Sequence, residues 1–131
     1  MLNINKPDFK NNIENLYLSP NIKKNWIYLY HDINSNNNDY NINKNIINYI
    51  LYIINQKADN EITLDIIDFI IKFGNENIKN EINKNEFVNQ IMNLLHKSHS
   101  FSQNFQKKLI YLIQIWANNN NNNNNFYNFF I

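Results

Sequence analysis

The side chains that most often carry out chemistry are scarce in this chain and do not cluster in the sequence. Cysteine is absent, which excludes disulfides, thiolate metal sites and cysteine nucleophiles. The three histidines, His31, His96 and His99, have no further histidine or acid at metal-ligand spacing. A single glycine cannot build a phosphate-binding loop, and no Ser-His-Asp order stands out. The residues therefore indicate no catalytic site, no metal and no cofactor.

Two aromatic residues are better suited to binding than to catalysis. Trp26 and Tyr30 belong to the residue types most enriched at binding hot spots, and their spacing of four places them on one face of a helix. Trp26 also continues an apolar stripe that includes Leu29 and Ile33. It is therefore either an exposed contact residue or part of the core, and both interpretations stay open on sequence alone.

Charge and composition narrow the possible partners. The 131 residues include 12 lysines, no arginine and 11 acids, which gives a net charge of +1. This balance is not the basic excess of a duplex nucleic-acid binder, so no nucleic-acid partner is expected. No apolar run is as long as a membrane span, and the first residues lack the apolar region of a signal peptide. A cytoplasmic location is expected.

Apolar residues recur at helical spacing along most of the chain, and this predicts an all-α fold. Asp59 or Asn60 is predicted to cap the helix that ends at Gly74, and Gly74 is expected to adopt the left-handed conformation of a helix end. Residues 98–102 are predicted to form a turn with capping hydroxyls. Seven helical segments are expected, at 9–17, 22–33, 46–54, 62–73, 78–82, 87–95 and 105–116.

The chain divides into three parts by composition. Residues 1–117 are predicted to form one helical domain. Residues 118–125 are an uninterrupted asparagine run, which is typical of a low-complexity linker. Residues 126–131 form an apolar tail, which is expected to begin an eighth helix unless the chain is a fragment of a longer protein.

The stretch from Asp59 to Ala117 resembles a VHS domain. A long apolar helix ends at Gly74, at the position of the family's glycine, and the last helix closes on Trp116, at the position of the family's tryptophan. Between them, Glu81-Ile82 and a helix opening on Phe87 follow the family's order, as does a His-Ser turn. The segments that carry the resemblance are Ile66–Gly74, Glu81–Phe87, Leu94–Ser100 and Leu109–Ala117.

The resemblance implies a right-handed superhelix of seven to eight α-helices, without enzyme activity. VHS domains belong to adaptors of vesicle and endosomal sorting, so the resemblance also implies a monomeric domain peripheral to endosomal or Golgi membranes. Related ENTH and ANTH domains share this architecture and bind phosphoinositide membranes. The alternatives are therefore such a lipid-binding module, or a helical scaffold with an unidentified protein partner.

The resemblance also assigns candidate binding residues. In ubiquitin-binding VHS domains, a tryptophan on the second helix and an apolar residue four positions later contact ubiquitin, and Trp26 and Tyr30 match these positions. Glu61, Ile62 and Asp65 would lie on the adjacent face of the fourth helix. The expected partner is ubiquitin or ubiquitinated cargo.

Two weaker sites are also expected, one from the resemblance and one from the lysines. Lys84 and Asn89 fall at positions resembling the pocket for acidic dileucine sorting signals, between the sixth and eighth helices. Two pairs of lysines could form a basic surface for phosphoinositides. Each lysine near an anionic membrane would contribute about 1 kcal/mol to the free energy of membrane binding. The four lysines are Lys23, Lys24, Lys107 and Lys108. Solvated lysines without a ligand are the alternative.

Overall fold

The computed structural model describes residues 8–34 and 40–119, and within these ranges the chain is all α-helical, without strands. The predicted all-α class is confirmed. The elements are α1 (Phe9–Leu18), α2 (Lys23–Asn34), α3 (Tyr40–Gln56), α4 (Glu61–Phe73), α5 (Glu76–Ile82), α6 (Asn85–Lys97), the 3-10 turn η1 (Ser98–Ser100) and α7 (Gln103–Asn119). Helix α7 extends two residues into the asparagine run, and the predictions for 120–131 lie outside the described residues.

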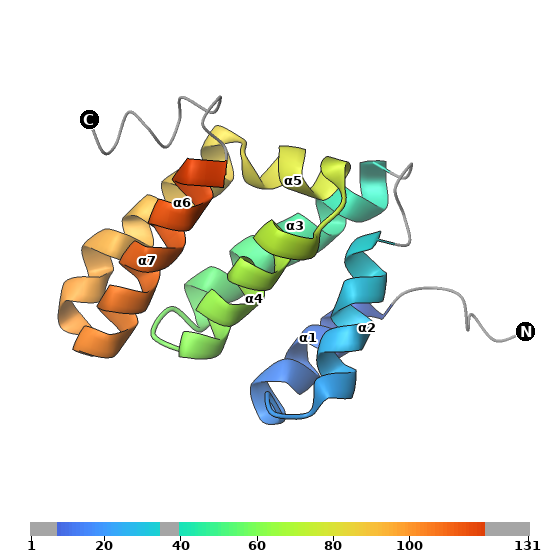
Figure 1. Cartoon of the computed structure of the whole chain (residues 1–131), viewed down its shortest axis with the longest axis horizontal. Coiled ribbons are helices and arrows are strands. Elements are labelled where there is room, and N and C mark those ends of the chain that lie inside the picture. Colours follow the sequence, from blue (N-terminus) through green and yellow to red (C-terminus); the bar gives the residue numbers. More distant parts are fainter. Residues whose placement is uncertain (1–7, 35–39, 120–131) are drawn as a thin grey trace, which may run out of the picture.

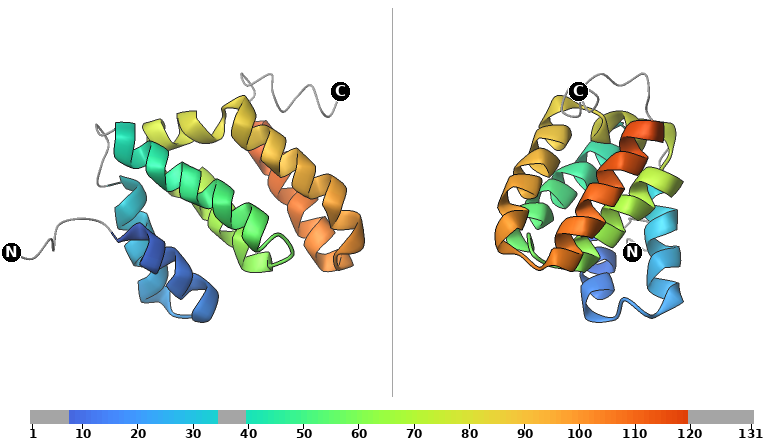
Figure 2. Two further views of the ribbon diagram at one scale, coloured as in Figure 1. Left: turned by 180° about the vertical axis from the view of Figure 1, so that it is seen from behind. Right: turned by 60° about the vertical axis from the view of Figure 1, so that its left-hand side comes forward.

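The helices lie in two layers. Helices α2, α4 and α7 form the layer nearer to the viewer in Figure 1, and α4 lies between the other two. Helices α1, α3 and α6 form the second layer, which Figure 2 shows from behind. The short helix α5 crosses one end of the molecule and contacts α3, α4 and α6. None of the helices in residues 8–34 and 40–119 combines the length and apolar character needed to cross a membrane.

Buried isoleucine, leucine and phenylalanine side chains from all seven described helices form one core between the layers. Trp116 is fully buried, packs edge-on against Phe87 with 5.7 Å between the ring centroids, and donates its indole N–H to Asn83 Oδ1 at 2.8 Å. This hydrogen bond satisfies the one polar atom of the indole, as a buried tryptophan requires. The family-like tryptophan therefore joins α7 to the end of α5.

Helix ends follow the predicted capping chemistry. Asn60 Oδ1 accepts a hydrogen bond from the N–H of Ile62 at 2.9 Å, and Glu61 lies in the first turn of α4, where it complements the helix dipole. The turn predicted at 98–102 is also confirmed, since η1 occupies it and Ser102 Oγ accepts from the N–H of Phe105 at 3.1 Å.

A hydroxyl pair formed by the half-buried Tyr17 and the buried Thr63 joins α1 to α4. The Tyr17 hydroxyl lies 2.6 Å from Thr63 Oγ1, and Thr63 Oγ1 donates to the carbonyl oxygen of Lys57 at 3.1 Å. Burial raises the pKa of Tyr17 to about 12. The phenol therefore stays protonated at neutral pH and can donate to Thr63, which places α1 against the first turns of α4.

The expected left-handed conformation of Gly74 is wrong. Gly74 has φ −68° and ψ 153°, an extended conformation, and its N–H donates to the carbonyl of Ile70 at 2.9 Å. Glycine is required here for space, because a Cβ atom would lie 2.7 Å from the Ile70 oxygen and 3.0 Å from Ile78 Cγ2. The close approach of the Ile70 carbonyl oxygen, together with Ile78 of α5, thus explains this glycine, rather than a positive φ.

We expect Gly74→Ala to lower the free energy of unfolding by about 1–3 kcal/mol, the usual cost of forcing an added carbon into a packed site. Urea denaturation followed by circular dichroism would measure the loss. Asn93→Ala, at an exposed position of α6, is the control and should change the stability by less than about 0.5 kcal/mol. Wild-type stability for Gly74→Ala would contradict the close approach.

Asp32 is a buried carboxylate in α2. It is 7% exposed, and its Oδ2 accepts a hydrogen bond from Asn12 Nδ2 at 2.8 Å across the α1–α2 contact. Burial raises the pKa of Asp32 above its usual value of 3.8, although the hydrogen bond from Asn12 opposes the shift. Because the folded state holds the proton more tightly than the unfolded state, ionised Asp32 lowers the stability at neutral pH.

We therefore expect Asp32→Asn to raise the free energy of unfolding at pH 7. The difference from wild type should shrink as the pH falls through the raised folded pKa toward 3.8, because the wild-type carboxyl is then protonated. Thermal melts between pH 7 and pH 4 would measure it, with Asp59→Asn at an exposed position as the control. A difference that does not change with pH would argue against the shift.

Candidate protein-binding site

Four aromatic side chains meet where α2 packs beside α4. Trp26 and Tyr30 come from α2, and Phe69 and Phe73 come from α4. The ring centroids are 5.3 Å apart for Trp26 and Phe69, 4.8 Å for Phe69 and Phe73, and 6.3 Å for Tyr30 and Phe73. Because both pairs are spaced by four residues and the helices run in the same direction, successive turns face each other. These four residues are called the aromatic surface.

The aromatic surface is partly open to solvent. Tyr30 is 45% exposed and Phe73 is 48% exposed, whereas Trp26 and Phe69 are half-buried. Contiguous exposed apolar side chains of this size are typical of interaction sites, and tyrosine and tryptophan are frequent hot-spot residues. The arrangement has the chemistry of a docking site for an apolar patch on another protein.

Trp26 combines features of both interpretations left open by the sequence. Its ring packs against the core through Phe69, and its indole N–H donates to the carbonyl of Pro20 at 2.9 Å. Leu29 and Ile33, by contrast, are fully buried. Trp26 is therefore a half-buried residue held in one orientation, with its remaining surface beside Tyr30 and Phe73.

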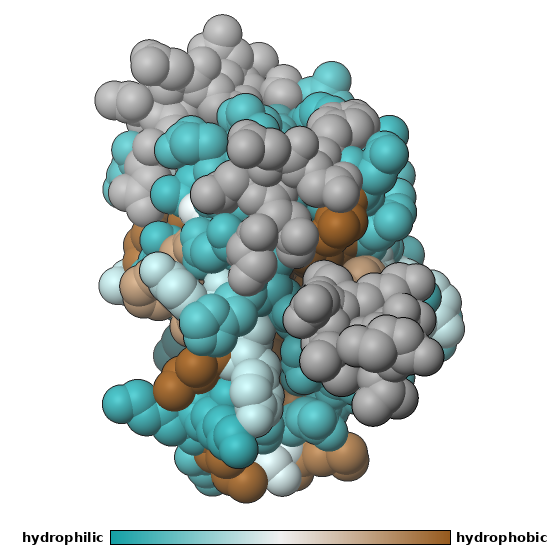
Figure 3. Space-filling model, turned by 90° about the vertical axis from the view of Figure 1, so that its right-hand side faces the viewer, coloured by the Kyte–Doolittle hydropathy of each residue, from teal (hydrophilic) through white to brown (hydrophobic). Residues whose placement is uncertain are grey.

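Other apolar side chains of α1, α2 and the turn between them are also exposed. Leu18, Ile22 and Ile27 are 80%, 52% and 45% exposed. Figure 3, which views the molecule from the side of α1 and α2, shows hydrophobic residues among hydrophilic ones on this face. The second helix was predicted to begin at residue 22, but α2 begins at Lys23 and Ile22 is exposed before it.

The predicted acidic residues of α4 lie next to α7 rather than inside the aromatic surface. Lys108 Nζ of α7 is 2.6 Å from Asp65 Oδ1 and 3.8 Å from Glu61 Oε1. Ile62 is half-buried and packs against the core. The structure therefore brings Trp26 and Tyr30 together with two phenylalanines, and it pairs Glu61 and Asp65 with a lysine.

Phe69 and Phe73 were not predicted as site residues, because the apolar composition of α4 suggested burial on most sides. The sequence carries no clear signal for them. Glu61, Asp65, Phe69 and Phe73 recur at intervals of four, but each step of four rotates the position by about 40°, so Phe73 lies about 120° around the helix from Glu61. The acids face α7 and the phenylalanines face α2, so the exposure of the acids does not predict that of the rings.

The four lysines predicted to contact lipid do not form one group. Lys23 and Lys24 belong to α2, Lys107 and Lys108 belong to α7, and α4 lies between these helices (Figure 1). Lys108 is paired with acids of α4, and Lys24 Nζ lies over the ring of Tyr28, 5.5 Å from its centroid. This arrangement does not concentrate positive charge on one face.

The residues predicted for the sorting-signal site do not form a pocket among the described residues. Lys84 occupies the N-cap position of α6, where its Nζ lies 2.7 Å from Glu81 Oε1, and Asn89 is an exposed residue of α6. An acidic peptide would have to compete with Glu81 for this lysine. The predicted eighth helix, which would complete the pocket, lies outside the described residues.

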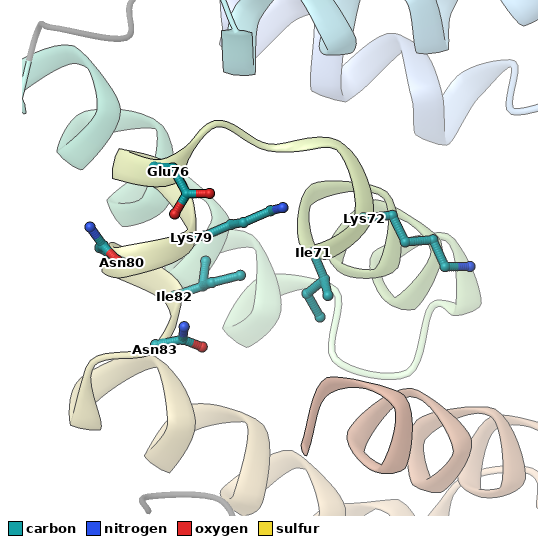
Figure 4. Close-up of a pocket in the computed structure, with 7 residues that line it drawn as sticks. All are labelled: Ile71, Lys72, Glu76, Lys79, Asn80, Ile82 and Asn83. Atoms are coloured by element: carbon teal, nitrogen blue, oxygen red, sulfur yellow. The ribbon is translucent and has the colours of Figure 1, made fainter. Parts of the chain in front are cut away.

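A polar cavity of ≈ 520 Å³ lies between α5 and the end of α4. Figure 4 shows Glu76 and Lys79 directed into this space from α5, with Ile71 opposite Ile82, while Lys72 points away. Lys72 Nζ pairs with Asp68 Oδ2 at 3.0 Å. Charges of both signs line the cavity, so its chemistry does not select one class of ligand. Among the described residues, no three histidines or acids gather to hold a metal ion.

The different burial of the two tryptophans gives a direct check of the aromatic surface. Trp116→Phe leaves the half-buried Trp26 as the only indole, and Trp26→Phe leaves the fully buried Trp116. We expect acrylamide to quench the fluorescence of the first variant more strongly than that of the second. Circular dichroism would verify that both variants are folded. Equal quenching would show that Trp26 is not at the surface.

Comparison with known proteins assigns no family to the chain. No family model, no curated protein and no solved structure matches it. The candidate function therefore depends on the aromatic surface and on the residues that resemble a VHS domain.

Proposed function

We propose that this chain is a VHS-type adaptor module of vesicle and endosomal sorting that binds ubiquitin, or ubiquitinated cargo, through the aromatic surface. The observation that carries the proposal is the exposure of Tyr30 and Phe73 beside the half-buried Trp26 and Phe69. The two layers of helices are compatible with the proposed right-handed superhelix. The proposed module works at the cytoplasmic side of endosomal or Golgi membranes, where it is recruited by its partners.

The energetics support a weak protein contact. Full burial of a large apolar side chain contributes about 1.5–3 kcal/mol. Tyr30 and Phe73 are each about half exposed, so together they supply about the value of one such residue. Trp26 and Phe69 hold these rings in place before binding, which lowers the entropy lost on association. A single contact of this size needs a second attachment in the assembled complex to give useful avidity.

Charged residues around the aromatic surface fit the polar rim of a protein interface. Asp68 and Lys72 form an exposed ion pair on α4, and Lys23 is exposed at the start of α2. Such groups stay solvated at the edge of an interface and set the orientation of the partner more than the affinity. The apolar centre with a mixed-charge edge suits a folded protein better than an anionic lipid surface.

Titration of the ¹⁵N-labelled chain with ubiquitin tests the proposal. We expect chemical-shift changes in α2 and in the second half of α4. Tyr30→Ala and Phe73→Ala should each weaken binding by about 1–2 kcal/mol, which is about fivefold to thirtyfold. Both side chains are about half exposed, so the fold should tolerate their removal.

Tyr111→Ala is the matched control, because Tyr111 is 64% exposed but belongs to α7. This variant should bind ubiquitin like the wild type. The absence of shift changes in α2 and α4 at millimolar ubiquitin would refute the proposed partner. Equal weakening by Tyr111→Ala would refute the proposed location.

A further inference from the structure

A groove between α1 and α3 lies in the helix layer that does not carry the aromatic surface (Figure 2). Its volume is ≈ 490 Å³, which is within the range of about 300–1,000 Å³ that is usual for ligand sites. It is lined by Phe9, Lys10, Asn45, Asn48, Tyr49 and Tyr52. These six residues define the α1–α3 groove.

Three aromatic rings form the apolar part of the groove. Phe9 meets Tyr49 edge-on at 5.8 Å between centroids, and Tyr49 and Tyr52 are stacked at 6.1 Å. Tyr52 is 56% exposed, and Phe9 and Tyr49 are half-buried. The rings are in contact with one another, and Tyr52 is the most exposed of them, so an apolar ring of a ligand can pack against its open side.

Polar groups stand beside the rings at regular intervals. Asn45 and Asn48 are exposed, and both lie within one turn of Tyr49 or Tyr52 along α3. Each amide offers two N–H donors and one acceptor oxygen. The Tyr49 hydroxyl donates to Glu14 Oε1 at 3.4 Å at the edge of the groove. The groove therefore combines stacking surfaces with donors for carbonyl oxygens.

Two groups of opposite charge lie beside Tyr49 in the groove. Lys10 Nζ lies 5.5 Å from the centroid of the Tyr49 ring, and Glu14 contacts the hydroxyl of the same residue. One cation and one anion favour an uncharged ligand over a polyanion. Single-stranded nucleic acid, which also stacks on aromatic side chains, usually requires a positively charged groove. The local charge therefore argues for a neutral peptide.

We propose that the α1–α3 groove binds a proline-rich segment of another protein in the polyproline II conformation. Such a segment has unpaired backbone carbonyls and an apolar pyrrolidine ring at each proline, and aromatic-lined grooves are its usual receptors. Tyr49, Tyr52 and Phe9 supply the ring contacts, and Asn45 and Asn48 supply amide donors for the carbonyls. The two prolines of the 131 residues, Pro7 and Pro20, are 13 positions apart, so neither belongs to a proline-rich segment.

Fluorescence polarisation with a labelled decaproline peptide and the full chain tests this inference. We expect saturable binding and chemical-shift changes confined to α1 and α3. Tyr52→Ala and Asn48→Ala should each weaken binding by at least about fivefold, as removal of a central interface residue does. Both positions are exposed, and melting curves would verify that the two variants remain folded.

Two further variants separate this groove from the aromatic surface. Tyr30→Ala should bind decaproline like the wild type, and Tyr111→Ala serves as a control for the loss of an exposed tyrosine elsewhere. Tyr52→Ala should leave the ubiquitin titration unchanged. The inference does not rest on the proposed ubiquitin function, so either can fail while the other holds.

Three results would overturn the inference. The first is no change in polarisation at millimolar chain concentration. The second is binding that a glycine-serine peptide of equal length reproduces, because such a peptide lacks pyrrolidine rings. The third is binding of a single-stranded oligouridine to α1 and α3 without binding of decaproline, which would assign the groove to nucleic acid.

Discussion

Helix α4 has a wide apolar face that has to be covered, and the positions of the other helices follow from this requirement. Six of its 13 residues are buried, namely Thr63, Leu64, Ile66, Ile67, Ile70 and Ile71. A helix with so wide an apolar face is stable in water only when other elements surround it. Helix α2 covers one flank and α7 covers the other, and Phe69 and Phe73 remain partly at the surface. The candidate binding site is thus the part of α4 that its neighbours do not reach.

The helices were predictable from the sequence because their apolar spacing and caps are local properties. The Asn60 cap and the serine turn at 98–102 depend on residues a few positions apart, and the structure has both. The extended conformation of Gly74 was not predictable, because the pattern of apolar residues does not show how the chain turns from α4 into α5. The contacts that leave no room for a Cβ atom come from the Ile70 carbonyl oxygen and from Ile78. The end of α7 was placed too early, since a run of asparagines carries no apolar pattern.

The candidate site was predictable only in part. Trp26 and Tyr30 were found through their residue types and spacing, whereas their neighbours Phe69 and Phe73 were not. Whether a phenylalanine on an apolar helix is buried depends on how closely the adjacent helix approaches, and a sequence pattern does not contain that distance. The α1–α3 groove was missed for the same reason: Phe9 belongs to one helix and Tyr49 and Tyr52 to another, and they become a groove only when these helices pack.

The aromatic surface is also part of the contact that attaches the α1–α2 pair to the rest of the molecule. The pair is held by the four rings and by the Tyr17–Thr63 contact. It is also held by two hydrogen bonds: Asn34 donates to the carbonyl of Phe73 at the end of α4, and Asn75 donates to the carbonyl of Ile33 near the end of α2. Local opening of a protein occurs where few buried contacts join a unit to its neighbours. A partner that contacts Tyr30 of α2 and Phe73 of α4 at the same time stabilises the packing of α2 against α4. Binding therefore raises the free energy of detaching the first two helices by RT ln(1 + c/Kd), where c is the free partner concentration, and amide hydrogen exchange in α1 and α2 slows as this concentration rises above Kd.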